Sequence, residues 1–124
     1  MTAPATRVGA RDLERRIARI LGATGVPDAD AVIAAAHLVE ADLRGVHSHG
    51  TIRVPTYVRE LRSGATNPRP NVHLAVDHGM QVTVDGDNGL GMVVAHRAND
   101  VAIARGREHG IAAVAIREIG RAHV

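Results

Sequence analysis

The sequence contains no cysteine, phenylalanine or tryptophan, and Tyr57 is its only residue of the Phe, Trp and Tyr class. Without cysteine the chain forms no disulfide and no thiolate metal site. This composition suits a reducing compartment, so we expect a cytoplasmic protein. The chain also lacks a basic cluster, and its formal net charge is only +2. With few aromatic rings for stacking on bases and no cationic patch for phosphates, the composition speaks against nucleic-acid binding.

Long apolar segments are absent as well. No apolar run approaches the roughly 18 residues of a membrane span. The first ten residues contain no apolar core of a secretory signal. The chain has 124 residues, 45% of them hydrophobic, which is enough for one compact domain. Because the core must be built from small aliphatic side chains that each bury little area, a stable fold needs good packing or more chain.

The first half of the sequence has a helical period. Apolar residues recur at helical spacing over 11–23, and a second helix is expected from Asp28 or Asp30, as its cap, to about Arg44. A third helix is expected from Thr51 or Val54 to Leu61, with Pro55 tolerated only in its first turn.

The second half has a different period. After a loop over 64–70, alternating apolar residues on either side of Asp77-His78-Gly79 predict a β-hairpin. A run rich in turn formers, 85–91, precedes a helix of about 15 residues, and the apolar run 111–116 predicts a buried strand. A buried strand needs neighbours on both sides, and only one hairpin is supplied. We therefore expect the N-terminal part of a longer protein: a helical region over 1–70 and the truncated start of an α/β region over 71–124.

The segment His47-Ser48-His49-Gly50, followed by Arg53, carries the strongest chemical signal. Histidine exchanges a proton near neutral pH, and arginine holds a carboxylate through two parallel hydrogen bonds. If a helix begins near Gly50, His49 and Arg53 lie about one turn apart and face one cleft.

Three other interpretations of this segment stay open. The side chains can be surface groups. Arg53 can form a salt bridge with Glu60 or Asp42. An extended His-x-His segment also places both rings on one face, where imidazoles bind zinc or iron, with a third ligand from elsewhere.

Two further features are weaker. Gly86, Gly89 and Gly91 precede a helix and can cradle an anion. However, the run lacks the ending of a phosphate-binding loop and carries two aspartates, which favours a structural loop. His123 follows the predicted strand 111–116 at its C-terminal end, where open α/β sheets bind ligands.

Together these residues resemble a known family. Gly45-Val46-His47-Ser48-His49-Gly50-Thr51-Ile52-Arg53-Val54-Pro55 is similar to the signature of the type-2 malate/L-lactate dehydrogenases. Further similar segments follow in the right order, so that the resemblance covers about residues 10–124: 61–64, Asn67-Pro68, 85–91, 96–98 and 111–117.

The resemblance implies a fold, a reaction and roles for individual residues. It implies an α/β protein with a helical N-terminal region and a mixed-sheet, non-Rossmann nucleotide-binding region, of which this chain holds the start. Members form homo-oligomers and reduce small 2-oxo acids, such as those of malate and lactate, with NADH or NADPH. By resemblance, His49 is the proton donor and acceptor, Ser48 orients the substrate or the His49 ring, and Arg53 binds the substrate carboxylate. His123 borders the cofactor, and His47 is a bystander.

The main hypothesis is therefore a fragment of an NAD(P)-dependent 2-hydroxyacid dehydrogenase, with no metal assigned. The alternatives are a non-catalytic helical module that binds a metal through His47 and His49, and a truncated chain without activity.

Overall fold

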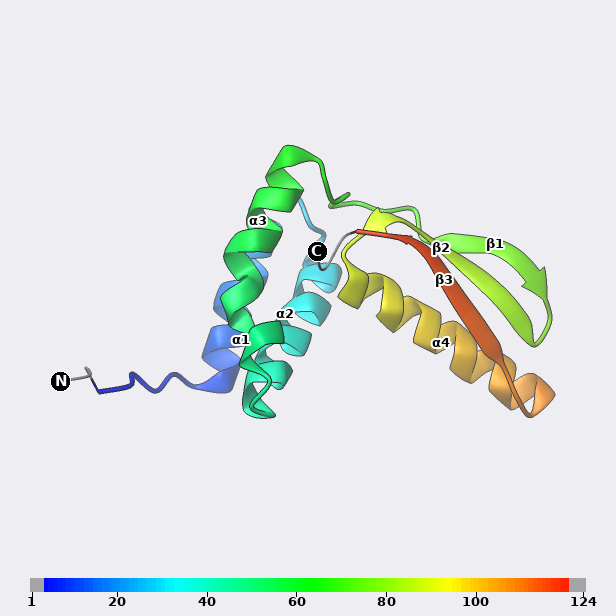
Figure 1. Ribbon diagram of the computed structural model, residues 1–124, viewed down its shortest axis with the longest axis horizontal. Coiled ribbons are helices and arrows are strands. Elements are labelled where there is room, and N and C mark those ends of the chain that lie inside the picture. Colours follow the sequence, from blue (N-terminus) through cyan, green and yellow to red (C-terminus); the bar gives the residue numbers. More distant parts are fainter. Residues whose placement is uncertain (1–3, 121–124) are drawn as a thin grey trace.

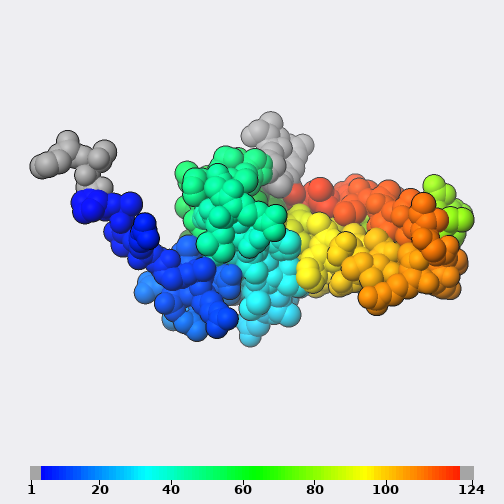
Figure 2. Space-filling model, turned by 90° about the horizontal axis from the view of Figure 1, so that it is seen from below, coloured from blue at the N-terminus to red at the C-terminus, as the bar shows by residue number. Residues whose placement is uncertain are grey.

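The computed structural model describes residues 4–120, which form four α-helices, two short 3-10 turns and three strands. In chain order these are α1 (Ala10–Gly22), α2 (Asp28–Leu43), η1 (His47–His49), η2 (Thr51–Arg53), α3 (Val54–Ser63), β1 (His73–His78), β2 (Gln81–Gly89), α4 (Gly91–His109) and β3 (Ala113–Ile119). Helices α1 to α3 gather at one end of an elongated body, and the sheet with α4 forms the other end (Figures 1 and 2). The α/β architecture predicted from the two periods is confirmed. No helix within residues 4–120 has the length and apolar character needed to cross a membrane.

The helical group is held together by aliphatic side chains at helical spacing. Each of the three helices buries at least two large residues, which form one cluster: Ile17, Leu21, Leu38, Val39, Tyr57 and Leu61. Burial of one such side chain is worth about 1.5–3 kcal/mol. Pro55 lies in the first turn of α3, as predicted, because the missing N–H is not needed there.

The start of α2 differs from the prediction. Pro27 occupies the cap position, and neither Asp28 nor Asp30 caps the helix with its side chain. Both aspartates lie in the first turn, where a negative charge is favourable beside the free N–H groups. Asp30 is buried and accepts two hydrogen bonds from Arg97 of α4 instead. The local sequence predicted that Asp30 could cap the helix, but its carboxylate binds Arg97, which is distant in the sequence.

The sheet is mixed, with the order β1-β2-β3. The predicted hairpin is present, since β1 and β2 are antiparallel, and α4 connects β2 to the parallel strand β3. Helix α4 lies along one face of the sheet (Figure 1) and packs Val94 and Ala98 against Val84. This contact is the second, smaller core of the described chain.

The glycine-rich run does not form the separate loop expected before α4. Strand β2 continues through Gly89, with a register shift against β3 and positive φ at Asp87 and Asn88. Its glycines permit close packing: a Cβ on Gly86 would lie 2.8 Å from the Glu118 carbonyl oxygen. The Asp87 carboxylate accepts a hydrogen bond of 2.8 Å from the Asn71 backbone N–H. The run therefore has the structural role that its aspartates favoured.

The last strand was predicted as a buried strand over 111–116, and that prediction was wrong in burial and in bounds. Strand β3 spans Ala113–Ile119, and within the described residues it pairs only with β2. Its side chains are mostly exposed, including Ile116 at 39% and Ile119 at 47%. An apolar run shows that a strand could be buried, not that it is. Strand β3 lies at the edge of the three-stranded sheet, and within the described residues only α4 covers its face.

Candidate functional site

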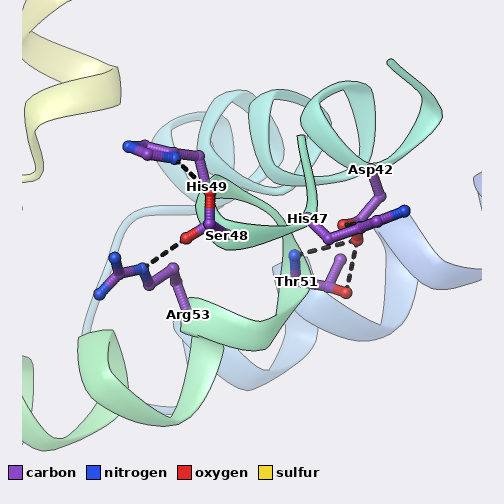
Figure 3. Close-up of polar contacts among 6 residues, drawn as sticks. All are labelled: Asp42, His47, Ser48, His49, Thr51 and Arg53. Carbon is purple, nitrogen blue, oxygen red and sulfur yellow. Dashed lines mark hydrogen bonds and ion pairs between the residues drawn. The ribbon is translucent and has the colours of Figure 1, made fainter. Parts of the chain in front are cut away.

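The segment with the histidine motif folds back over the end of α2. Gly45, with φ of +77°, turns the chain after the helix, and the Val46 N–H donates to the carbonyl of Ala41 over 2.8 Å. Turns η1 and η2 then follow one another and lead into α3 (Figure 3). This conformation places side chains of the segment on two sides.

On one side, the segment is bound to Asp42 of α2. One carboxylate oxygen, Oδ2, accepts hydrogen bonds from the Thr51 N–H at 3.0 Å and from the Thr51 hydroxyl at 2.6 Å. The other oxygen, Oδ1, lies 3.1 Å from Nδ1 of His47. The hydrogen bond from the Thr51 hydroxyl is the main cause that lowers the pKa of Asp42, with smaller contributions from the Thr51 N–H and from His47.

On the other side of the segment, Ser48 contacts both His49 and Arg53, the two residues with predicted roles in the reaction. Its hydroxyl lies 2.9 Å from Nδ1 of His49, and its carbonyl oxygen accepts a hydrogen bond of 2.7 Å from Nε of Arg53. Figure 3 shows His49 and Arg53 on the same side of the segment, with Ser48 between them. The structure therefore brings together the three residues that the motif singled out.

The alternative salt bridge of Arg53 is not observed. Among residues 4–120, no carboxylate lies within ion-pair distance of Arg53, because Asp42 turns toward Thr51 and the Glu60 carboxylate lies 3.4 Å from the Thr66 hydroxyl. The terminal guanidinium nitrogens of Arg53 thus have no anionic partner within this part of the chain. A ligand carboxylate fits such a group.

The chelate suggested by the His-x-His spacing depended on an extended backbone, and the backbone is a 3-10 turn. The rings consequently diverge: His47 points toward Asp42 and His49 points toward Ser48 and Arg53 (Figure 3). Within residues 4–120, no three histidine or carboxylate side chains are grouped as metal ligands. The geometry therefore offers no support for the metal-binding alternative.

The exposure of the motif residues could not be predicted from the sequence. Ser48 and His49 are exposed and Arg53 is half-buried, so the described residues present them on an open face. His123 lies outside the described residues.

Asp42 and Thr51 were missed as partners of each other, because nine positions of separation match no helical or strand period. The only available signal was the carboxylate close before the motif.

Comparisons with known proteins identify the family of this chain. The family described as malate/L-lactate dehydrogenase matches residues 8–123. Malate dehydrogenase of Pyrococcus horikoshii is 43% identical over 101 residues, which are 82% of this chain and 28% of that protein. Its solved structure superposes with a TM-score of 0.89 at 40% identity, covering 92% of this chain and 33% of the other.

Two further relatives have other substrates in their names. L-sulfolactate dehydrogenase of Methanocaldococcus jannaschii is 38% identical over 104 residues, covering 84% of this chain and 30% of the relative. Ureidoglycolate dehydrogenase (NAD(+)) of Escherichia coli K12 is 32% identical over 114 residues, covering 92% and 33%. The chain thus spans about a third of the length of the curated relatives that it matches.

Proposed function

Because the chain belongs to the malate/L-lactate dehydrogenase family, which matches residues 8–123, we propose that it carries the substrate-binding and proton-transfer residues of an NAD(P)-dependent dehydrogenase of small 2-hydroxy acids. The observation that carries this proposal is the grouping of His49, Ser48 and Arg53 on one side of a single turn segment. Malate, sulfolactate and ureidoglycolate, which appear in the relatives' names, are all 2-hydroxy acids, and this supports the substrate class.

His49 is the proposed proton carrier. A nicotinamide cofactor, NAD or NADP, supplies or accepts the hydride when it is bound. Reduction of a ketone at C2 leaves an alkoxide oxygen that needs a proton, and an imidazole gives one up near neutral pH. The Ser48 hydroxyl, 2.9 Å from Nδ1 of His49, orients the ring so that Nε2 faces the substrate oxygen. In the direction of oxidation, the same nitrogen takes the proton from the hydroxyl group.

Arg53 is the proposed binding group for the substrate carboxylate. Its Nε donates to the Ser48 carbonyl, which fixes the side chain and leaves the terminal nitrogens for an acid. A carboxylate held at this position lies beside His49, since Ser48 contacts both residues. Holding the acid in one orientation next to the proton carrier removes much of the entropic barrier to reaction.

The two predicted regions have separate roles in this proposal. Region 1–70 carries the motif, and region 71–124 begins the part that binds the cofactor. Gly86 and Gly89 of the run 85–91 are packed against neighbouring atoms, so we assign these two glycines a structural role. His123 remains the proposed cofactor neighbour, by family resemblance. Because the described motif is open, we propose that further chain encloses it and that these 124 residues alone do not oxidise NADH.

An assembly is part of the same proposal. Three large apolar side chains beside the motif are strongly exposed, namely Leu43 at 66%, Val46 at 47% and Ile52 at 71%. Exposed apolar side chains that lie together beside a functional motif often form a surface that contacts another protein chain. This exposure supports the homo-oligomer that the family resemblance predicts. An active enzyme that sediments as a monomer would contradict it. A cytoplasmic location is proposed on separate grounds, because the sequence has no cysteine.

A chimera tests the function. Residues 8–120 would replace the matching segment of the Pyrococcus horikoshii malate dehydrogenase, and oxidation of NADH or NADPH would be followed with oxaloacetate and pyruvate. The chimera should be active. His49→Ala should lower kcat by about 10²- to 10⁴-fold, because general acid–base catalysis is lost. Arg53→Ala should act mainly on KM, and Arg53→Lys should restore only part of the affinity, because lysine lacks the fork of donors.

Controls separate this effect from damage to the fold. His37→Ala, an exposed histidine on α2, should leave kcat and KM unchanged. Turnover by the His49→Ala chimera at the rate of its parent would overturn the assignment of His49. NADH oxidation by the isolated 124-residue chain would overturn the proposal that further chain is required.

A further inference from the structure

Asp42 contacts two residues of the motif segment, and both of its carboxylate oxygens take part. It lies in the last turn of α2, and its side chain is 22% exposed. Its two oxygens bind residues from both 3-10 turns: His47 at the start of η1 and Thr51 at the start of η2. One carboxylate therefore ties both turns to the same helix.

The backbone between the turns is pressed against this carboxylate. A Cβ built on Gly50 would lie 2.0 Å from Oδ1 of Asp42 and 2.4 Å from its Cγ. Gly50 is buried and its φ is −94°, which any residue adopts, so glycine is required here by the close approach and not by the backbone conformation. The packing leaves the segment little freedom to move relative to α2.

The predicted chemical residues stand at the ends of these two turns. His49 ends η1, and its N–H donates to the Val46 carbonyl over 3.0 Å. Arg53 ends η2, and its N–H donates to the Gly50 carbonyl over 3.0 Å. Both N–H groups donate to backbone carbonyls and not to Asp42, yet the position of each residue depends on a turn that the carboxylate holds.

We propose that Asp42 is a positioning residue, whose carboxylate fixes the 47–53 segment on α2 and thereby sets the relative positions of Ser48, His49 and Arg53. Hydrogen bonds to an ionised group are about twice as strong as neutral ones, which suits a clamp made by a single side chain. What the positioned residues do rests on the function proposed above. The clamp itself rests only on the contacts of Asp42.

The clamp is tested in the 124-residue chain by amide hydrogen exchange. The N–H groups of His49 and Arg53 are the reporters, since neither donates to Asp42. Both should exchange at least about tenfold faster in Asp42→Ala, with Asp42→Asn between it and the wild type, because a neutral acceptor binds more weakly. Glu40→Ala removes an exposed carboxylate from the same helix and should leave both rates unchanged. The amides of Leu38 and Val39 in the core report whether the fold is intact.

Variants at Thr51 keep the proposal testable if Asp42→Ala does not fold. Thr51→Val removes the hydroxyl donor and should also speed exchange at His49 and Arg53. Thr51→Ser retains the donor and should restore rates close to those of the wild type. A purely steric contribution of Thr51 would give the opposite order, because valine matches the shape of threonine. Equal rates in Thr51→Val and Thr51→Ser, or in Asp42→Ala and Glu40→Ala, would overturn the proposal.

A second readout connects the clamp to the site. Sodium oxamate, an analogue of a 2-oxo acid, would be titrated into the chimera described above, taken as the wild type, and into its variants, while the Nε–H signal of Arg53 is followed by NMR. Affinity should fall about tenfold in Asp42→Ala and recover in Thr51→Ser relative to Thr51→Val. If the wild type binds no oxamate, the proposed function of Arg53 fails, while the exchange rates still decide the role of Asp42. If oxamate binds equally to Asp42→Ala and Glu40→Ala, the positioning role fails and the proposed function stands.

Discussion

At the scale of single residues, two histidines of the same motif have opposite surroundings. A 3-10 turn sends His47 to the carboxylate of Asp42 and His49 to the hydroxyl of Ser48. The sequence resemblance singled out His49, and the geometry supports that choice, because His49 is the ring that lies near Arg53. Residues two apart on a 3-10 turn point in different directions, whereas residues two apart on a strand share a face.

Among the glycines that the structure describes, Gly50 has the least room for a side chain. Gly50→Ala should lower the free energy of unfolding by about 1–3 kcal/mol, because the new Cβ collides with the Asp42 carboxylate and overpacks the turn. Urea unfolding followed by circular dichroism measures the change.

Gly106→Ala is the matched control for Gly50→Ala. Gly106 lies within α4, and a Cβ there meets no atom within 4 Å. Alanine in a helix interior should therefore stabilise the chain by about 0.5–1 kcal/mol. A Gly50→Ala chain as stable as the wild type would show that the turn yields easily and that the clamp at Asp42 is loose.

At the scale of elements, two carboxylates join the strands to their neighbours. Asp77 at the end of β1 accepts from the Gly79 N–H at 3.0 Å and from Arg105 of α4 at 2.5 Å. Asp85 of β2 accepts from the Asp87 N–H at 2.9 Å and from Arg117 of β3 at 2.9 Å. In each case the backbone N–H is the largest cause that lowers the pKa of the carboxyl group, and the arginine adds to it.

These lowered pKa values predict an acid-sensitive sheet. The folded state holds the two carboxyl groups ionised below their ordinary pKa of 3.8, so it binds fewer protons than the unfolded state. Their contribution to stability is therefore complete above about pH 4 and is lost as the pH falls through the folded-state values. Urea unfolding midpoints measured from pH 6 down to pH 2.5 should stay level to about pH 4 and decrease below it.

The double variant Asp77→Asn, Asp85→Asn is the test of this cause. It should be less stable than the wild type near neutral pH, and its midpoint should fall less on acidification, because asparagine does not titrate. Parallel curves for the two proteins would assign the acid sensitivity to other groups.

The elements also show where local patterns were reliable. Helical spacing located α1, α2 and α3, because a buried stripe on a helix depends on the helix's own side chains. The same logic failed for β3, whose apolar run predicted burial. Whether a strand is covered depends on what lies beside it, and β3 has α4 on one face and β2 on one edge within the described chain.

At the scale of the whole molecule, one ion pair helps to connect the helical group to the sheet. Arg97 of α4 binds both carboxylate oxygens of Asp30 in α2, at 2.7 and 2.8 Å, and the Asp30 side chain is only 6% exposed. Figure 1 shows α2 and α4 side by side where the two groups meet. The pair therefore influences how the motif on one side stands relative to the α/β part on the other.

Arg97→Gln should destabilise the chain by about 1–3 kcal/mol, because it leaves a buried carboxylate without its partner. Arg44→Gln breaks an exposed pair with Glu40 and should cost at most about 0.5 kcal/mol. Adding Asp30→Asn to Arg97→Gln should recover part of the loss in urea unfolding, since no unpaired charge then remains. Equal effects of Arg97→Gln and Arg44→Gln would show that the pair is as weak as a surface contact.

The sequence by itself determined the helices, the hairpin, the family and the motif with His49 and Arg53. Each of these depends on residues that are close in the sequence: apolar spacing, turn residues, or a run of neighbouring side chains. Only the tertiary structure decided that Asp42 holds Thr51 and His47 and that Asp30 binds Arg97 and does not cap α2. It also decided that β3 is exposed at the edge of the sheet formed by the described residues. These features join residues that no local period relates. Which group a carboxylate binds, and whether a strand is covered, depends on residues that are distant in the sequence and come together only when the chain has folded.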